Sequence, residues 1–578
     1  MHKSFYKLLL YFVFTLILLS YYVAIKIGMN PDESFHHANG ALRYLYMKSL
    51  GTFEGGDVWS TRFYPGLYDT ITYILLILLD NFINIKYTIE IRHTINWLVS
   101  FLGVVGLFLL NKKIFNKEIA ILSCVLTLLN PIFFGHMGMN PKDPVIFTSL
   151  IWSIYFFINY LENLEGPRFK YLILMSLAIG FGCSIRITFA SLIIPLFFVW
   201  TYVIFKKKIN ITSIILDILC GLFIILFLTF LTWPDIHNGN FIILLEIIER
   251  SSSWLIAFKH GIINGKFYEV GDTPRTYILQ IFLFRVPLYF SILIIFSYLI
   301  VFFRKKFFNE NFNSNFLIFF SFLNLILFFP IIMMIITKTN LYDNARLILF
   351  TMPFFATFAS IGLFYIIMKF KEFGLLYKSF SFIVLLLMLL SFYRFLALTP
   401  YQYAYTNYLS TPKYSMGKNK FEHDYIFTSY PELMKKIVKK YGEVEASKLK
   451  IRTCDNHYWS HKFYFKNILK TKQTPGHIAE YVIMTNRNLK YRKMNCFQLF
   501  EGEDVVSVKR LGLTLSTFRK VQSEEAQLYN TVIWDVKNRK WYKEMQEENK
   551  LKKNKHKELR KKYDQNRGAF VNTIINPD

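Results

Sequence analysis

Two acidic residues followed by two histidines form the first cluster whose residue types could do chemistry. Asp32 and Glu33 follow Pro31, and His36 and His37 come one helical turn later. Proline suits the first position of a helix, and carboxylates suit its positive end. On such a helix Asp32 shares a face with His36, and Glu33 with His37. Because the cluster stands at a membrane edge, where charged groups are costly, its position favours a functional site over simple helix caps.

Further charged clusters stand at the ends of other apolar runs. Lys142 and Asp143 follow Asn140, Arg186 separates two apolar stretches, and Arg346 stands at the start of another run. Arginines at this depth normally pair with an anion, and phosphate matches a guanidinium group well. Each cluster alone could be structural. Together they predict carboxylates, histidines and cations on one face of a membrane.

The composition requires most of the chain to lie in lipid. Of 578 residues, 53% are hydrophobic and only 18% are charged, with a mean hydropathy of +0.32. A soluble domain carries about a quarter charged residues. The 61 Phe, 37 Tyr and 9 Trp residues exceed what one water-soluble core could bury. A soluble enzyme, a disordered scaffold and a disulfide-rich secreted module are therefore excluded.

The net charge of +28 follows membrane topology. Lys and Arg residues gather in short clusters between apolar runs and near the C-terminal end, which is typical of the positive-inside rule with a basic tail. No base-reading motif accompanies this charge. We therefore predict a lipid bilayer as partner and no nucleic acid.

Eleven apolar runs are long enough to cross roughly 30 Å of hydrocarbon. They are residues 8–27, 91–110, 119–136, 143–161, 170–187, 188–205, 210–232, 277–303, 315–337, 346–369 and 378–399. With the N-terminus in the cytoplasm, almost every basic loop falls on the cytoplasmic side. Residues 67–85 are left out of this count. We predict an interfacial or re-entrant helix there, because a full crossing would turn the later Lys clusters outward.

The expected fold class is an all-α polytopic membrane protein with about eleven spans and a small extracytoplasmic α/β domain. Residues 1–399 form the transmembrane domain, residues 400–530 the α/β domain, and residues 531–578 a basic tail that is helical or disordered.

Two strands and one helix are expected in the C-terminal region. Residues 443–453 and 480–485 are strand-like, and residues 432–441 are helical. Cys454 and Cys496 could form a disulfide if this region lies outside the cytoplasm. The cysteine spacing predicts no zinc site.

A lipid-phosphate sugar donor needs such a combination of groups at one membrane face. Arg or Lys would neutralise the departing phosphate, and a carboxylate would accept the proton of the attacking hydroxyl as general base. The sequence contains no glycine-rich nucleotide loop, so a soluble nucleotide donor is not indicated.

At these residues the sequence resembles the GT-C superfamily of membrane glycosyltransferases, in particular bacterial relatives of dolichyl-phosphate-mannose–protein mannosyltransferases. The motifs that carry this resemblance are Pro31-Asp32-Glu33, Phe63-Tyr64-Pro65-Gly66-Leu67-Tyr68, Asn140-Pro141-Lys142-Asp143, Trp233-Pro234, Pro274-Arg275-Thr276-Tyr277, Tyr342-Asp343-Asn344-Ala345-Arg346 and Pro400-Tyr401-Gln402-Tyr403-Ala404-Tyr405-Thr406-Asn407. The sequence departs from the common pattern at Gly66, where a second proline is usual.

The resemblance implies a polyprenyl-phosphate-linked sugar donor and inverting transfer to a protein, lipid or glycan acceptor outside the cytoplasm. It makes Asp32 the candidate general base, with Asp143 and Glu33 as further catalytic candidates. The implied substrate-binding residues are His36, His37, Arg62, Asn140, Lys142, Arg186, Tyr342 and Arg346. Some members of the superfamily use a divalent cation, and His36 and His37 with Asp32 and Asp143 could bind one. The motif set is that of bacterial members, which implies the bacterial inner membrane.

Two other functions are compatible with the sequence. A transporter or flippase of polyprenyl-linked sugars would share the lipid cavity and the arginines but would need no catalytic base. An O-antigen-ligase-type polymer transferase would rely on Arg and His residues of a large outer loop, and residues 233–276 contain His237, Arg250, His260 and Arg275. The acidic pair after the first span favours transfer from a single-sugar carrier.

Overall fold

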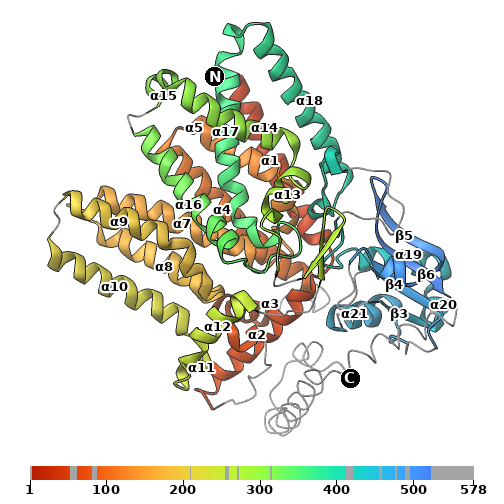
Figure 1. Cartoon of the computed structure of the whole chain (residues 1–578). Helices are drawn as coiled ribbons and strands as arrows, with labels where there is room; N and C mark the ends of the chain where they lie inside the picture. Colours follow the sequence, from red (N-terminus) through yellow and green to blue (C-terminus); the bar gives the residue numbers. More distant parts are fainter. Residues whose placement is uncertain are drawn as a thin grey trace.

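The protein is mostly helical in the computed structural model (Figure 1). The structure describes residues 3–52, 61–80, 88–207, 210–253, 260–269, 272–312, 315–410, 421–454, 458–474, 478–487 and 495–521. The expected tail over residues 531–578 lies outside these residues. The predicted class, a helical polytopic membrane protein with a small sheet in its C-terminal region, is confirmed.

Eighteen α-helices precede the C-terminal region in the described chain. They are α1 (Lys3–Lys26), α2 (Pro31–Lys48), α3 (Leu67–Asp80), α4 (Thr88–Ile114), α5 (Lys117–Leu128), α6 (Pro131–His136), α7 (Asp143–Glu162), α8 (Phe169–Ile185), α9 (Ile194–Lys207), α10 (Ile211–Phe230), α11 (Pro234–His237), α12 (Ile242–Ser253), α13 (Tyr277–Phe284), α14 (Leu288–Phe303), α15 (Lys305–Asn311), α16 (Phe316–Ile336), α17 (Met352–Lys369) and α18 (Leu375–Ala397). A hairpin of β1 (His260–Ile263) and β2 (Lys266–Glu269) lies between α12 and α13.

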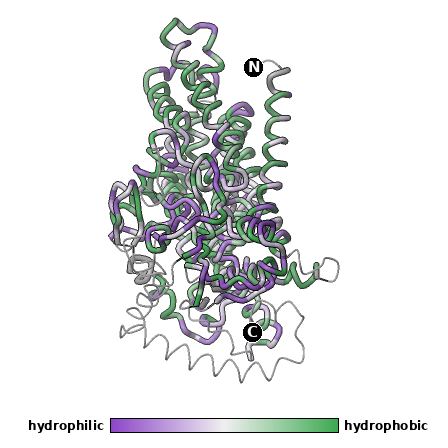
Figure 2. Tube along the Cα trace, turned by 90° about the vertical axis from the view of Figure 1, so that its right-hand side faces the viewer, coloured by the Kyte–Doolittle hydropathy of each residue, from purple (hydrophilic) through white to green (hydrophobic). Residues whose placement is uncertain are grey.

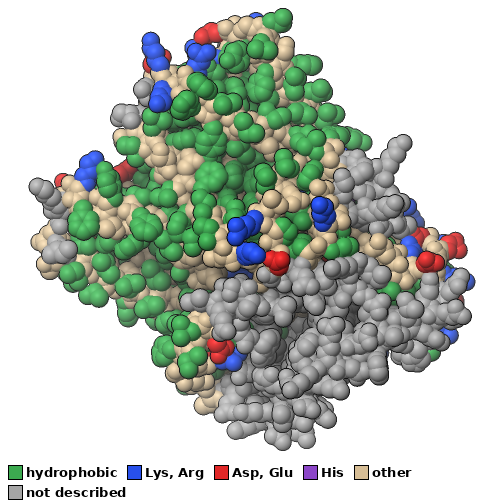
Figure 3. All heavy atoms as spheres, in the orientation of Figure 1, with side chains coloured by type: hydrophobic (Ala, Val, Ile, Leu, Met, Phe, Trp, Pro, Cys, Tyr) green, Lys and Arg blue, Asp and Glu red, His purple; other side chains and the backbone are tan. Residues whose placement is uncertain are grey.

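Eight helical segments of the described residues are long and apolar enough to cross a membrane, which makes the chain a multi-pass membrane protein. The apolar stretch that contains α17 is 89% buried and that of α7 is 78% buried, against 22% for α1 and for α10. The helices α7 and α17 therefore form the interior of the bundle, whereas α1 and α10 face lipid. Hydrophobic side chains accordingly cover much of the helical bundle on the face shown in Figure 3.

Residues 119–136 form two short helices, although a single span was expected there. Leu129 is the C-cap of α5, and Asn130 is the N-cap of α6. The Asn130 side chain accepts hydrogen bonds from the amides of Ile132 and Phe133, and Pro131 occupies the first helical position. The twelve residues of α5 extend only about 18 Å. From Ile119 onward α5 is buried by its neighbours, so it belongs to the protein core.

The expected span over residues 277–303 is sharply broken. The axes of α13 and α14 meet at 114°. Pro287 lies at the break, and proline disfavours a helical conformation in the residue before it. The helix α8 lies close to the expected span over residues 170–187. It has 17 residues and is only slightly shorter than the helices that are long enough to cross a membrane.

The helix α3 lies where an interfacial or re-entrant helix was expected. Its 14 residues extend about 21 Å, which is short of the roughly 30 Å of a hydrocarbon core. It packs against α2, and hydrophilic segments gather in the same lower half of the molecule in Figure 2. Whether residues 67–85 cross the membrane stays a prediction, because residues 81–87 lie outside the described chain.

The C-terminal region contains a four-stranded sheet that lies beside the helical bundle (Figure 1). Its strands, in the order β3-β4-β6-β5, are β3 (Ile451–Thr453), β4 (Tyr481–Thr485), β6 (Leu513–Val521) and β5 (Gly502–Arg510). β3 runs parallel to β4, and the other pairs are antiparallel. The accompanying helices are α19 (Tyr430–Tyr441), α20 (Glu443–Lys448), α21 (Tyr458–Tyr464) and α22 (Cys496–Leu499).

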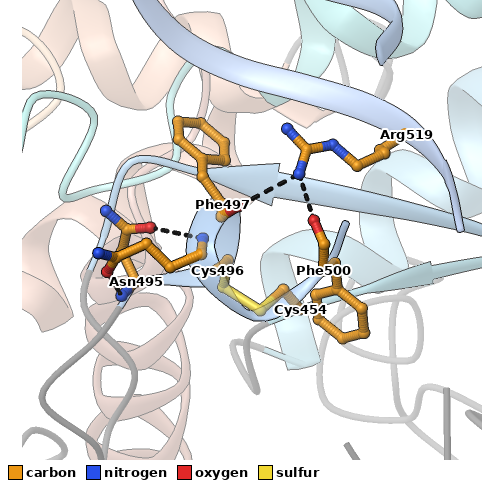
Figure 4. The surroundings of a disulfide bond; sticks show 7 residues. Cys454, Asn495, Cys496, Phe497, Phe500 and Arg519 are labelled. Atoms are coloured by element: carbon orange, nitrogen blue, oxygen red, sulfur yellow. Dashed lines mark hydrogen bonds between the residues drawn. A yellow bond between two sulfur atoms is a disulfide. The ribbon is translucent and has the colours of Figure 1, made fainter. Parts of the chain in front are cut away.

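The predicted strand over residues 443–453 is wrong in its first half. Residues Glu443–Lys448 form α20, because Glu, Ala and Lys favour a helix at this surface, and only Ile451–Thr453 pair into the sheet. The expected helix and the strand that ends at Thr485 are confirmed. The disulfide between Cys454 and Cys496 is present and connects the end of β3 to α22 (Figure 4).

Candidate active site

The start of α2 fixes the position of Asp32. Asn30 is the N-cap: its side chain accepts a hydrogen bond from the amide of Asp32, at 2.9 Å. Glu33 completes a capping box, because its Oε2 accepts from the amide of Asn30 at 2.7 Å. Pro31 occupies the first helical position. Asp32 therefore projects from a rigid, fully capped helix start.

Three carboxylates surround the guanidinium group of Arg346. Arg346 begins the 3-10 turn Arg346–Thr351 that leads into α17. Its Nη2 binds Asp32, its Nε lies 3.2 Å from Asp143 Oδ2, and its Nη1 lies 3.1 Å from Asp343 Oδ2. The turn after α16 and the starts of α2 and α7 thus meet at one guanidinium group.

Lys142 adds a second cation to Asp32. Its Nζ lies 3.3 Å from Asp32 Oδ2 and 5.3 Å from the centre of the Tyr64 ring. Asn140 holds the start of α7, because its Oδ1 accepts from the amides of Lys142 and Asp143 and its Nδ2 donates to Asp143 Oδ2 at 2.7 Å. The predicted cluster over residues 140–143 therefore converges on Asp32 and Arg346.

Asp32 is the accessible carboxylate of this cluster. Its side chain is 32% exposed, against 6% for Asp143 and 3% for Asp343. Burial raises the pKa of Asp32, but Arg346 and Lys142 outweigh burial and hold that pKa well below its usual range. Burial has the larger effect at Asp343 and raises its pKa, opposed by Arg487 and Arg346. Asp32 is therefore ionised and partly open to a ligand.

His36 is oriented by a carboxylate of α3. Its Nδ1 lies 2.8 Å from Asp69 Oδ2, and Asn39 donates to the same oxygen at 2.6 Å. Burial lowers the pKa of His36, against the opposing effect of Asp69. The charge of Asp32 also acts on His36, as the shared helix face predicts. His37 lies elsewhere, with its ring 5.2 Å from that of Tyr73.

Glu33 is buried between helices. Its Oε2 lies 3.0 Å from Nε2 of His93 on α4, and only 1% of its side chain is exposed. His93 Nδ1 in turn lies 2.6 Å from the carbonyl oxygen of Ala24 at the end of α1. Glu33 thus connects α1, α2 and α4 behind Asp32. A direct part in catalysis stays a prediction for this residue.

The remaining predicted residues divide into two groups. The charge of Arg186 acts on Asp143 and Arg346, and no salt bridge of Arg186 occurs among the described residues. Tyr342 lies near the same cluster, because the charge of Arg346 acts on its hydroxyl. Burial raises the pKa of the Tyr342 hydroxyl. Arg62 is engaged elsewhere, because its Nη2 lies 3.3 Å from Asp235 of α11.

Asp343, Asp69 and Arg487 were not among the candidate residues. Asp343 and Asn344 both have left-handed backbone conformations, with φ of 54° and 58°. Asp and Asn are the residues that tolerate this conformation best after glycine, so the pair signalled a tight turn at the site. Asp69 stands in an amphipathic helix start. No sequence motif around Arg487 indicated a role for it at the site.

The described residues do not form the divalent-cation site that the resemblance left open. No group of three or more His, Cys, Asp or Glu side chains in the described chain is arranged to hold a metal ion. Asp32 and Asp143 bind Arg346, and His36 binds Asp69.

The fold and site define a multi-pass membrane protein with an ionised carboxylate held by cations at a helix start. Within it, residues 90–233 match the family model described as dolichyl-phosphate-mannose-protein mannosyltransferase. The resemblance expected from the motifs is confirmed for this segment. Among curated proteins, no match is found.

Two solved structures are similar to part of this chain. ArnT from Cupriavidus metallidurans, bound to undecaprenyl phosphate, is 12% identical with a TM-score of 0.39, over 61% of this chain and 60% of that one. The Archaeoglobus fulgidus oligosaccharyltransferase, in complex with Zn and sulfate, is 12% identical with a TM-score of 0.37, over 81% of this chain and 67% of that one. The protein thus spans about three fifths of the length of ArnT.

Proposed function

We propose that the protein is a membrane glycosyltransferase that moves a sugar from a polyprenyl-phosphate carrier to an acceptor hydroxyl outside the cytoplasm, with Asp32 as general base. One observation carries this proposal. Asp32 is ionised, 32% exposed and bound to Arg346 and Lys142. A base for the acceptor and two cations for a phosphate are therefore within reach of one substrate.

The proposed reaction forms one bond and breaks one at the anomeric carbon, and it moves one proton from the acceptor hydroxyl to Asp32. The acceptor oxygen attacks the anomeric carbon of the sugar while Asp32 takes the hydroxyl proton. The bond between the anomeric carbon and the phosphate oxygen breaks, and its electron pair leaves with the phosphate. Arg346 and Lys142 neutralise that charge. Because the acceptor attacks opposite the leaving phosphate, the configuration inverts.

The pairing of Asp32 with Arg346 and Lys142 describes the enzyme before substrate binds. With such a low pKa, Asp32 is a weak base. A donor phosphate would compete for the same two cations. Asp32 would then lose part of their stabilising effect, and its pKa would rise toward the value that base catalysis needs. Donor binding thereby activates the base.

Neighbouring groups support these roles. Asp143 and Asp343 hold Arg346, and Asn140 holds Asp143. Arg186 adds positive charge beside Asp143 and is the guanidinium group available for a second phosphate contact. Asp69 orients His36 near Asp32, and Glu33 anchors the helix start.

The domain and topology assignments are part of the proposal. Residues 1–399 are the catalytic transmembrane domain, and residues 400–530 form a domain outside the cytoplasm of a bacterial inner membrane. The disulfide between Cys454 and Cys496 supports this side, because disulfides persist in oxidising compartments. The acceptor is a protein, lipid or glycan of that compartment.

A transfer assay tests the proposal. Purified protein in lipid nanodiscs is incubated with radiolabelled polyprenyl-phosphate sugars, one at a time, and with native membrane extract as acceptor. Label that moves from one donor to the extract supports the proposal. Saturable binding of donors without transfer from any of them would contradict it and favour the flippase function.

A further inference from the structure

The C-terminal sheet contributes an arginine to the neighbourhood of the site. Arg487 follows β4 by two residues, and its Nη2 lies 3.0 Å from Asp343 Oδ1. Both side chains are buried, at 7% and 3% exposure, and the guanidinium group lies 5.4 Å from the centre of the Phe427 ring. A buried pair with this geometry fixes the position of both partners.

Asp343 also contacts Arg346, and its position therefore affects that of the Arg346 guanidinium group. Its Oδ2 lies 3.1 Å from Arg346 Nη1, so one carboxylate bridges two guanidinium groups. Arg346 in turn binds Asp32. A continuous chain of charge-assisted contacts therefore runs from the C-terminal sheet to the candidate base.

The turn that carries Asp343 is attached to the C-terminal region a second time. Asn344 donates from its Nδ2 to the carbonyl oxygen of Glu422 at 3.0 Å. The left-handed backbone at Asp343 and Asn344 aims the carboxylate and the amide side chain at these partners. The turn is thus held from the C-terminal side at two consecutive residues.

Arg487 also adds positive charge to the cluster. Asp32, Asp143 and Asp343 contribute negative charge, and Arg346 and Lys142 contribute positive charge. Among the described residues, Arg487 is the cation that the C-terminal region adds through Asp343. Without it, Asp343 loses one of the two guanidinium groups that it binds, and it is the carboxylate that gains a proton most easily because burial already raises its pKa.

We infer that Arg487 is a positioning residue of the active site, which acts through Asp343 to hold the Arg346 guanidinium in the orientation that receives the donor phosphate. The C-terminal region is accordingly part of the catalytic unit and not a separate module. This inference rests on the proposed function, because it assigns a role in turnover.

Arg510 offers a matched control. It also connects the C-terminal sheet to the transmembrane part, because its Nε donates to the carbonyl oxygen of Thr399 at 3.0 Å. Its Nη2 lies 2.7 Å from Glu432 Oε2. These contacts are separate from Asp343 and Arg346. Replacement of Arg510 therefore measures how kcat responds when the contact between the C-terminal sheet and the transmembrane part is weakened without a change at Asp343 or Arg346.

The first test compares Arg487→Met, Arg487→Lys and Arg510→Met in the full chain in nanodiscs. We expect Arg487→Met to lower kcat for sugar transfer about tenfold with an unchanged KM for the acceptor. Arg487→Lys, which keeps the charge, should recover most of this loss, and Arg510→Met should have the wild-type kcat. Equal kcat values for Arg487→Met and Arg510→Met would overturn the inference.

The second test is a double-mutant cycle, which also covers the case that Arg487→Met alone does not fold. Combined with Asp343→Asn, it replaces both members of the buried pair and leaves no unbalanced charge. If Arg487 acts through Asp343, Arg487→Met should change kcat by less than about twofold in the Asp343→Asn background. A further tenfold loss would overturn the inference. Failure of the wild type to transfer sugar from any donor would instead contradict the proposed function.

Discussion

The Nζ of Lys142, the N-cap residue of α7, lies 3.3 Å from Oδ2 of Asp32 in α2, although the two residues are far apart in the sequence. This contact joins the acidic start of α2 to the second motif at the start of α7. Together with Arg346 it places the candidate base and the candidate phosphate-binding groups in one cluster.

Replacement of Arg346 by lysine should weaken use of the donor. Lysine keeps the charge but loses the fork that contacts three carboxylates. We expect the KM for the donor to rise about tenfold, with a smaller change in kcat. Steady-state kinetics over a range of donor concentrations measure this. An unchanged donor KM, together with a lower melting temperature, would give Arg346 a structural role only.

Truncation of the Arg346 side chain to alanine should destabilise the folded protein more than replacement by lysine does. Arg346→Ala leaves three carboxylates without their common partner, and breaking a buried ion pair from one side costs about 3–5 kcal/mol. The melting temperature of the purified variant should therefore fall well below that of Arg346→Lys. Equal melting temperatures for the two variants would contradict the ion-pair network.

His36 should make stability depend on pH. Burial lowers its pKa below the ordinary value of 6.5, so the unfolded chain binds this proton more readily than the folded protein. Its contribution to stability is therefore complete above pH 6.5 and declines as the pH falls from there toward the folded-state pKa. The slope amounts to at most about 1.4 kcal/mol per pH unit for one proton.

The His36→Gln variant tests this contribution. Melting temperatures between pH 5 and pH 8 should fall less steeply toward acid for the variant than for the wild type. His237→Gln serves as control, because His237 lies outside the Asp32 cluster, beside Tyr46. Parallel curves for His36→Gln and the wild type would show that His36 does not titrate differently in the folded protein.

The cysteines should report the side of the membrane. Cys454 and Cys496 form a disulfide, whereas Cys124, Cys183 and Cys220 are free. If the C-terminal region is outside the cytoplasm, protein denatured without reductant should take up three alkylating groups per chain, and five after reduction. Mass spectrometry counts them. Alkylation of Cys454 and Cys496 without prior reduction would place this region in the reducing cytoplasm.

The sequence predicted those parts of the fold that depend on local pattern. Long apolar runs predicted α1 and α4, because about twenty consecutive apolar residues suffice to span a bilayer. It did not predict the break of residues 119–136 at Asn130, where a side-chain cap interrupts an otherwise continuous apolar run. The strand predicted at the position of the short helix α20 is wrong, because six residues are too few to show the hydrophobic periodicity of a helix.

The sequence could predict those site residues that stand at the boundaries of apolar runs. Asp32 follows the first apolar span, and Asp143 and Arg346 begin later ones. Counting the spans predicts these three residues at one face of the membrane, and the structure brings them together. Asp343 was overlooked because its role depends on a left-handed turn. Arg487 was overlooked because its contact is made by the folding of a separate sheet onto the bundle, which leaves no pattern in the sequence.

The most direct test of the central claim is single-turnover sugar transfer by Asp32→Asn beside the wild type, with donor binding measured on the same preparations. Asparagine preserves the size of the side chain but cannot take the acceptor proton. Asp272→Asn, which changes an exposed aspartate paired with Lys338, is the matched control. We expect Asp32→Asn to bind donor and to transfer sugar about 10²–10⁴-fold more slowly. Transfer at the wild-type rate would contradict the role of Asp32 as general base.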